Sequence, residues 1–235
     1  MTPAYGDLST AIIALAGTPE HSSTLDGRLT TIAKLTAERV AAARYASVTA
    51  LRGNARTTVA VNDDLIRSVD DAQYADGAGP CLQALAGGAP VGVPDIDTTV
   101  QWPGFHREAP RMGLLASVSV PLFAGRGDPI AALNVYSHDR EAMAPLIAGI
   151  CSVHEHPARV TDDQVLAGLD EGGRDLVTGY AESLSVRATI RLALELIRSR
   201  THCTPDDAYL SLCIRALGNG TDLAEAATTL IGRGV

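Results

Sequence analysis

The sequence predicts an α+β protein: an antiparallel sheet flanked by helices, followed by a small three-helix module at the C-terminus. Three observations predict this fold class. The β-rich segments come in pairs separated by short turns, which is typical of antiparallel hairpins. Helical runs lie before, between and after these pairs. Beyond about residue 150 no strand pattern remains, and helical periodicity with helix-capping residues follows.

The first expected element is a long amphipathic helix over residues 24 to about 44, in which leucine and isoleucine recur at helical spacing and Thr24 is the N-cap. Hairpins and short helices are expected after it. They are a hairpin of residues 45–51 and 57–61, a helical or irregular segment over 63–74, a short helix over 81–86, a strand over 90–93, and two strands over 114–123 and 129–137. Because the strands pair as hairpins, the sheet is expected to be antiparallel.

The C-terminal third is expected to be helical. A helix starts with good capping chemistry at residues 161–164, but four glycines between residues 168 and 179 weaken it, each by about 1 kcal/mol relative to alanine. Stronger helices are expected over 184–200, 205–217 and from Thr221 to Gly232. The predicted organisation is an N-terminal extension (1–23), an α+β domain (24–150), a helical connector (151–182) and a helical module (183–235).

The amino-acid composition excludes some classes of protein. The chain has 235 residues, of which 46% are hydrophobic, enough to bury a core. Its 27 acidic and 19 basic residues give a formal net charge of −8, and Lys34 is the only lysine. An acidic chain does not coat nucleic acid non-specifically, which argues against a general DNA- or RNA-binding protein but leaves room for a local arginine face. With no basic signal sequence and no apolar run long enough to span a bilayer, the protein is expected in the cytoplasm.

Cysteine and histidine spacing gives no sign of a metal site or of catalysis. The four cysteines lie far apart, and no pair has the C-x-x-C spacing of zinc or dithiol redox sites. His154 and His156 flank Glu155, a spacing that points alternate residues to opposite faces of a helix. No cofactor and no catalytic residue is identifiable. We therefore expect that the chain is not an enzyme.

Several ordered motifs in the first 150 residues carry a family resemblance. They are residues 73–84 (QYADGAGPCLQA), 94–96 (PDI), 101–105 (QWPGF), 117–122 (SVSVPL) and 132–137 (ALNVYS). Together they resemble a GAF domain of the actinobacterial kind over about residues 24–150. The resemblance implies a central antiparallel sheet with helices on one side and a ligand pocket on the other. GAF domains bind cyclic nucleotides, haem, bilins or small metabolites, and none of these ligands has a distinct signature in this sequence.

Three residues within these motifs are candidates for the ligand pocket: Cys81, Trp102 and Phe105. Cys81 begins a short helix, whose dipole lowers a thiol pKa, so a redox or ligand-linking role is one interpretation. The favoured interpretation is a small buried residue at a tight Gly-Pro turn. Trp102 and Phe105 line a pocket rim or, as the favoured alternative, anchor a loop over an aromatic-poor core.

Residues 183–231 resemble the ANTAR domain, the RNA-binding module of transcription antitermination regulators. A GAF domain followed by such a module is a familiar architecture in actinobacterial regulators. The residues that match the family pattern are Arg187, Ile190, Ala193, Asp207, Ala208, Tyr209, Leu212, Asn219 and residues 223–227. The sequence departs from the pattern at Val186, at Leu194-Glu195 (Lys-Gly in the family), at Cys213 and at Ala216. The last turn has one extra residue and lacks the family's basic residues.

Charge placement gives the physical test of this resemblance. Residues 180–235 contain six arginines and six acidic residues, so the module is neutral and residues 1–179 hold the whole net charge of −8. At about 100° per residue, the three arginines Arg187, Arg191 and Arg198 lie with Leu194 within about 60° on one helix face. Arginine suits phosphate contacts, and Tyr209 is suited to stack on an unpaired base. These three arginines and Tyr209 are the predicted RNA-binding residues. Solvated arginines and a core tyrosine are the alternative interpretation.

Two alternative functions follow from these resemblances and from the charge placement. In the first, a signal acts at the GAF-like domain, and a dimeric C-terminal module binds hairpin loops in a nascent transcript and promotes transcription antitermination, as the resemblance implies. In the second, the module has lost RNA binding and serves only dimerisation or protein interaction. The expected partners are RNA, a second copy of the chain and a small-molecule ligand, with no membrane.

Overall fold

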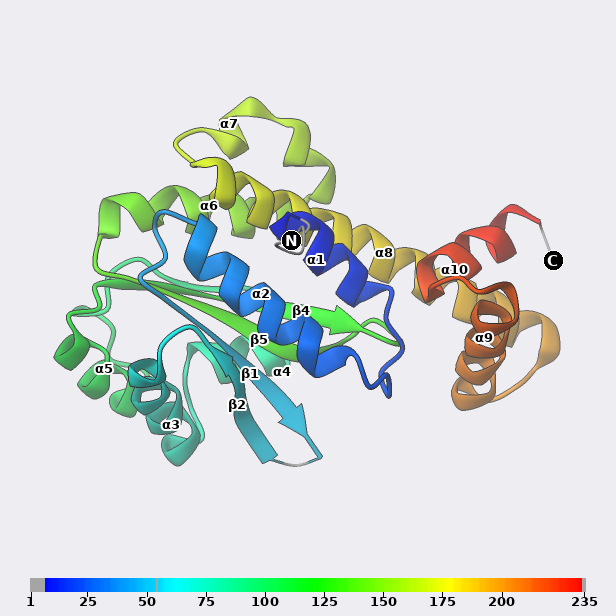
Figure 1. The fold of residues 1–235 in the computed structure, drawn as a ribbon, viewed down its shortest axis with the longest axis horizontal. Helices are drawn as coiled ribbons and strands as arrows, with labels where there is room; N and C mark the ends of the chain where they lie inside the picture. Colours follow the sequence, from blue (N-terminus) through cyan, green and yellow to red (C-terminus); the bar gives the residue numbers. More distant parts are fainter. Residues whose placement is uncertain (1–6, 54, 234–235) are drawn as a thin grey trace, which may run out of the picture.

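A five-stranded antiparallel sheet forms the centre of the computed structural model, which describes residues 7–53 and 55–233 (Figure 1). The strands lie in the order β2-β1-β5-β4-β3. Their bounds are β1 Tyr45–Arg52, β2 Ala55–Val61, β3 Val91–Val93, β4 Ala116–Ala124 and β5 Asp128–Ser137. Every neighbouring pair is antiparallel. The fold class predicted from the sequence is therefore confirmed.

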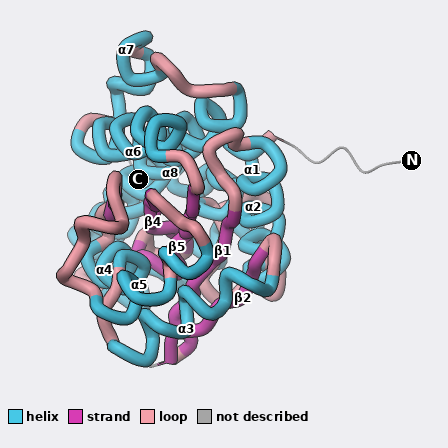
Figure 2. The backbone as a smooth tube through the Cα atoms, turned by 90° about the vertical axis from the view of Figure 1, so that its left-hand side faces the viewer, coloured by secondary structure: helices cyan, strands magenta, loops and turns pink. Residues whose placement is uncertain are grey.

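Helices cover both faces of this sheet (Figure 2). One layer consists of α1 Leu8–Ala16, α2 Leu25–Arg39, α6 Arg140–Glu155 and α8 Glu171–Thr201. The other layer consists of α3 Arg67–Asp76, α4 Pro80–Gly87 and α5 Pro103–Glu108. The short helix α7, Asp163–Leu166, lies between α6 and α8 in sequence. The face on which the family resemblance implied a ligand pocket thus lies under α3, α4 and α5.

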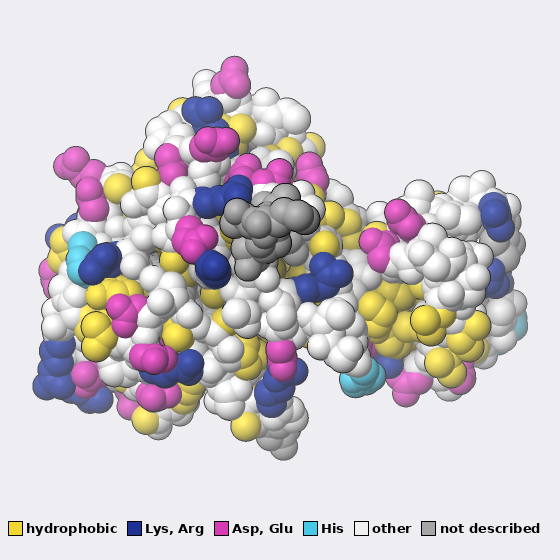
Figure 3. Space-filling view, viewed as in Figure 1, with side chains coloured by type: hydrophobic (Ala, Val, Ile, Leu, Met, Phe, Trp, Pro, Cys, Tyr) yellow, Lys and Arg dark blue, Asp and Glu magenta, His cyan; other side chains and the backbone are white. Residues whose placement is uncertain are grey.

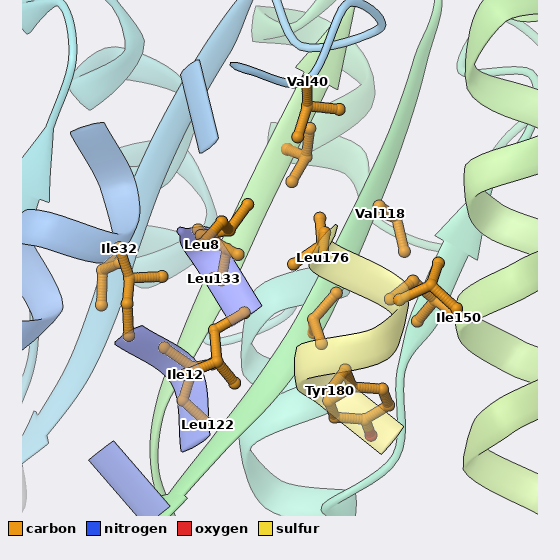
Figure 4. Close-up of a cluster of buried hydrophobic side chains, with 14 of the residues drawn as sticks. Leu8, Ile12, Ile32, Val40, Val118, Leu122, Leu133, Ile150, Leu176 and Tyr180 are labelled. Atoms are coloured by element: carbon orange, nitrogen blue, oxygen red, sulfur yellow. The ribbon is translucent and has the colours of Figure 1, made fainter. Parts of the chain in front are cut away.

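Side-chain alternation divides the sheet into an apolar face and a polar face. Along β4, Val118 and Val120 join the large hydrophobic core, whereas Ser117 and Ser119 point to the opposite side. Side chains from α1, α2, α6 and α8 meet the apolar face in this core (Figure 4). The labelled members are Leu8, Ile12, Ile32, Val40, Val118, Leu122, Leu133, Ile150, Leu176 and Tyr180. All ten are almost fully buried.

The helix α1 was not predicted from the sequence, which indicated only an N-terminal extension. It packs against α8 and contributes Leu8, Ile12 and Leu15 to the main core. Asp7 caps it by accepting a hydrogen bond from the Thr10 backbone N–H at 2.8 Å. The next helix, α2, begins at Leu25 as expected but ends at Arg39 rather than near residue 44, because Val40 takes an extended backbone.

The helix α8 runs without interruption from Glu171 to Thr201. Two of the glycines that were expected to weaken this region, Gly172 and Gly179, are required by close packing. A Cβ atom at Gly172 would lie 2.1 Å from the Arg39 carbonyl oxygen, and one at Gly179 would lie 2.6 Å from the Ser9 Cα atom. Glycine therefore lets α8 approach the end of α2 and the start of α1.

The last part of α8 forms a three-helix module with α9 Pro205–Asn219 and α10 Leu223–Gly232. This module has its own hydrophobic core, which begins at Ile190, whereas the last α8 residue of the main core is Leu184. Figure 1 shows the module at the far end of α8 from the start of that helix. Among the residues that the structure describes, no helix combines the length and the apolarity that a membrane crossing requires.

Candidate functional site

A group of hydrogen-bonding side chains lies buried between the polar face of the sheet and the helices α3 and α4. We call it the buried polar cluster. Its members are Ser47, Thr49, Thr58, Asp70, Gln73, Tyr74, Cys81, Asn134 and Tyr136. Six of them (Ser47, Thr49, Asp70, Gln73, Cys81 and Asn134) have an exposed fraction of 0%. Burial of so many polar groups is costly unless they pair with one another, so their pairing defines the chemistry of this site.

Asp70 is the acidic centre of the buried polar cluster. The Tyr136 hydroxyl donates to one of its carboxyl oxygens at 2.7 Å, and the Thr58 hydroxyl donates to the other at 2.9 Å. Burial away from water raises the pKa of this carboxyl from 3.8 to about 6, although these hydrogen bonds oppose the shift. Asp70 is therefore a carboxyl group poised to gain or lose a proton near neutral pH.

The other members link the strands to the covering helices. The Asn134 amide donates to the hydroxyls of Ser47 and Thr49 at 3.1 and 3.0 Å. The Gln73 side chain accepts a hydrogen bond from the Cys81 backbone N–H at 3.1 Å, which fixes the start of α4 to α3. Two buried oxygen atoms, Asn134 Oδ1 and Ser117 Oγ, have no hydrogen-bond partner. These acceptors suit a polar ligand or a water molecule.

Of the three predicted pocket residues, one lies in this cluster and two lie in a neighbouring hydrophobic cluster. Cys81 belongs to it, and burial, the largest cause, raises the pKa of its thiol. This direction is opposite to that of a reactive thiolate. Trp102 and Phe105 are 6% and 0% exposed and meet edge to face with 6.2 Å between their ring centroids. They pack in a separate hydrophobic cluster with Tyr136, at the end of the sheet covered by α5.

The predicted RNA-binding arginines share one face of α8, which we call the arginine face (Arg187, Arg191 and Arg198). Arg187 lies 4.3 Å from the centre of the Phe123 ring, and its Nε donates to the Gly127 carbonyl oxygen at 2.7 Å. Arg191 forms an ion pair with Asp128 at 2.8 Å, and Arg198 one with Glu195 at 2.7 Å. Arg191 and Arg198 expose 47% and 40% of their side chains. Two of the three arginines thus contact the β4–β5 turn, the name we use for residues 125–128, which include the first residue of β5.

Tyr209 lies on α9 with only 7% of its surface exposed. Its hydroxyl accepts a hydrogen bond from the Glu20 backbone N–H at 3.0 Å. Arg126 covers the ring at 4.7 Å from its centroid. In this arrangement the ring is part of the contact between the module and the rest of the chain, and it is not open to a base.

The described part of the chain contains no group of three or more histidine, cysteine or acidic side chains placed to hold a metal ion. In the His154-Glu155-His156 segment, His154 Nδ1 lies 2.8 Å from the Tyr180 hydroxyl, and the two rings stack.

The first domain thus combines an antiparallel sheet with a buried polar site covered by short helices. The sequence model of the GAF domain family matches residues 22–146, more than half of the chain. The chain belongs to the GAF domain family and is a signal-sensing regulatory protein of a class that binds small-molecule ligands. The match ends before α8, so it does not include the three-helix module. A comparison with curated proteins found no match to the chain.

Sequence reasoning missed most of the buried polar cluster, above all Asp70, Asn134 and Tyr136. A signal was present in the strands. Polar residues alternate with apolar ones in 45–50, 116–120 and 133–136, which predicts a sheet with one polar face. Since that face is covered by helices rather than by water, the alternation marks a buried site. The position of Asp70 on α3 carries no such signal.

Proposed function

We propose that the chain is a signal-responsive regulator whose C-terminal three-helix module binds RNA hairpin loops in nascent transcripts and promotes transcription antitermination. In this proposal the GAF domain senses the signal, the module is the output, and the chain acts in the cytoplasm as a homodimer without catalysis. The observation that carries the proposal is the arginine face. One continuous helix leaves the sensor core and carries three guanidinium groups along one side, with Arg187 between the two cores and Arg191 and Arg198 within the module.

Arginine is the side chain best suited to this role, since its planar fork of donors matches the oxygens of a phosphate group. Three such groups are few for a tight RNA complex, and a dimer doubles them. The resemblance to the ANTAR domain supports the same output and the same dimeric assembly.

A filter-binding assay with a synthetic two-hairpin RNA tests the proposal. The double variant Arg191→Glu plus Arg198→Glu is expected to abolish binding, and wild-type binding is expected to weaken as salt rises. The control is Arg215→Glu plus Arg233→Glu, which changes the net charge by the same amount at exposed positions of the module away from the arginine face. Equal losses in both variants, or no salt-sensitive binding by the wild type, would contradict RNA binding at the arginine face. Read-through of a terminator in a transcription reaction then measures antitermination.

A second function, protein interaction by the module, is favoured by one specific observation. The outer side of α9 exposes Leu210, Ile214 and Leu217, with exposed fractions of 58%, 60% and 82%. The space-filling view shows apolar side chains gathered over this helix (Figure 3). Residues at this spacing form one helical stripe, and such a stripe serves protein contacts better than phosphate contacts. Loss of assembly in Ile214→Lys with unchanged RNA binding would assign the two roles to different faces of the module.

A further inference from the structure

The turn between β4 and β5 reaches across to the module, and its Arg126 ties three segments together. Arg126 Nε donates to the Glu20 carboxylate at 2.8 Å, and one terminal nitrogen donates to Asp206 at 2.5 Å. Its guanidinium also stacks on the Tyr209 ring. Glu20 lies between α1 and α2, whereas Asp206 and Tyr209 belong to α9. One side chain of the sensor domain therefore holds the second helix of the module.

The same turn also offers oxygen atoms to the arginine face. Gly127 presents its carbonyl oxygen to Arg187, and Asp128 presents its carboxylate to Arg191. The approach is close, because a Cβ atom at Gly127 would lie 2.8 Å from Arg187 Cγ. Carbonyl and carboxylate oxygens meet these guanidinium groups as phosphate oxygens do. The turn thus presents to the arginine face the same kind of ligand that an RNA backbone presents.

A cleft of about 370 Å³ lies beside these contacts, and three guanidinium groups line it. Its lining residues are Arg126, Asp128, Arg191, Leu194, Glu195, Arg198 and Pro205. The two acidic side chains in the lining, Asp128 and Glu195, are 70% and 67% exposed. Ion pairs as open as these are weak, so a polyanion that enters the cleft competes with them readily.

Backbone hydrogen bonds also connect the module and the β4–β5 turn to the segment that follows α1. The Leu223 N–H at the start of α10 donates to the Gly17 carbonyl oxygen at 3.1 Å. The turn residue Gly125 donates its N–H to the neighbouring Thr18 carbonyl oxygen at 2.8 Å. The segment after α1 and the β4–β5 turn therefore form one platform against which α9 and α10 rest.

We propose that this platform is an autoinhibitory clasp, in which the β4–β5 turn occupies the arginine face and competes with RNA phosphates for Arg187 and Arg191. The inference rests on the proposed function and names its regulation. The closed state lowers the apparent RNA affinity by the fraction of molecules that are open. A signal in the GAF domain acts by shifting this fraction, since the turn joins β4 and β5, the two strands that carry Ser117, Ser119, Asn134 and Tyr136.

The test opens the clasp from the sensor side and leaves the arginine face intact. In the full chain, Arg126→Ala plus Asp128→Ala removes the bridge to α9 and the partner of Arg191. The matched control is Glu108→Ala plus Arg111→Ala, which removes the ion pair between the last residue of α5 and exposed Arg111. The helix α5 lies far from the module (Figure 1). Two quantities are measured: hydrogen exchange of the Glu20 amide, which donates to Tyr209 in the closed state, and affinity for a synthetic two-hairpin RNA.

The opened variant is expected to exchange the Glu20 amide faster and to bind the RNA about tenfold more tightly than the wild type, while the control changes neither. Faster exchange with unchanged, measurable RNA affinity would overturn the clasp and leave the proposed function standing. Unchanged exchange would overturn the clasp as well, because the turn would then not hold the module. Absence of RNA binding by both the wild type and the opened variant would overturn the proposed function. It would also overturn the clasp, which rests on that function.

Discussion

Asp70 shows how a single residue makes the buried polar cluster sensitive to pH. Its hydrogen-bond partners are hydroxyl groups, which stabilise an ionised carboxylate less than a cation does. Burial therefore dominates, and the pKa rises to about 6. Tyr74, Tyr136 and Cys81, which face Asp70, also have raised pKa values, because burial disfavours their charged forms. Asp70 is the member of the cluster that changes charge near neutral pH.

The first prediction concerns Asp70→Asn. Because the pKa of Asp70 is higher in the folded chain than its ordinary value of 3.8, the folded state binds the proton more tightly. The stabilisation is complete below about pH 4 and is lost as pH rises through about 6, with a total of about 3 kcal/mol. Urea unfolding across this range measures the free energy of unfolding. The wild type is expected to lose stability relative to Asp70→Asn as pH rises, and parallel curves would contradict the raised pKa.

The second prediction concerns the thiol of Cys81. Full burial and a raised pKa both suppress the thiolate that reacts with alkylating reagents. In the native chain, Cys203, which is only partly buried, is expected to be alkylated at least tenfold faster than Cys81. Mass spectrometry of the alkylated peptides measures both rates in one sample. Rapid labelling of Cys81 in the folded chain would support the redox interpretation instead.

At the scale of elements, the strands were predictable and the contacts among helices were not. The hairpins of β1 with β2 and of β4 with β5 follow from β-rich runs and short turns, which are local features of the sequence. The helix α1 was missed because its apolar run is short, and its stability depends on packing against α8, α2 and β4. For the same reason the platform around Arg126 was not foreseen. It joins residues about 80 to 190 positions apart, and a single sequence does not encode such pairings locally.

The third prediction concerns Gly179→Ala, whose effect on stability we expect to be opposite to the one that helix propensity predicts. Replacing glycine by alanine inside a helix usually stabilises it by about 1 kcal/mol. At Gly179 we expect the reverse, a loss of roughly 1–3 kcal/mol, because the added Cβ would lie 2.6 Å from the Ser9 backbone. The control is Gly218→Ala in α9, where an added Cβ meets nothing within 4 Å and stability is expected to stay level or rise. Thermal unfolding of both variants measures these changes in stability. A stabilised Gly179→Ala would show that α1 and α8 are not closely packed.

At the scale of the whole molecule, part of the negative charge that gives the chain its net charge of −8 lies against the arginine face. Asp128 of the sensor part pairs directly with Arg191 of the arginine face. Arg126, also of the sensor part, binds Glu20 on its own side of the contact and Asp206 of the module on the other. The sequence count located the net negative charge outside the module but did not indicate that part of it lies against the arginine face. Two hydrophobic cores lie on either side of this contact, and α8 contributes residues to both.

The last prediction follows from these two cores. Trp102 is the only tryptophan and is buried in the GAF domain, so its fluorescence reports unfolding of that domain, whereas circular dichroism reports all helices. Leu212→Ala removes a fully buried side chain from the module core and is expected to destabilise it by about 2–5 kcal/mol. In urea, part of the helical signal should then be lost at lower concentration while the Trp102 transition stays in place. Leu133→Ala, in the main core, should instead move the Trp102 transition. If Leu212→Ala moved both transitions together, the contact at Arg126 would couple the two cores into one cooperative unit.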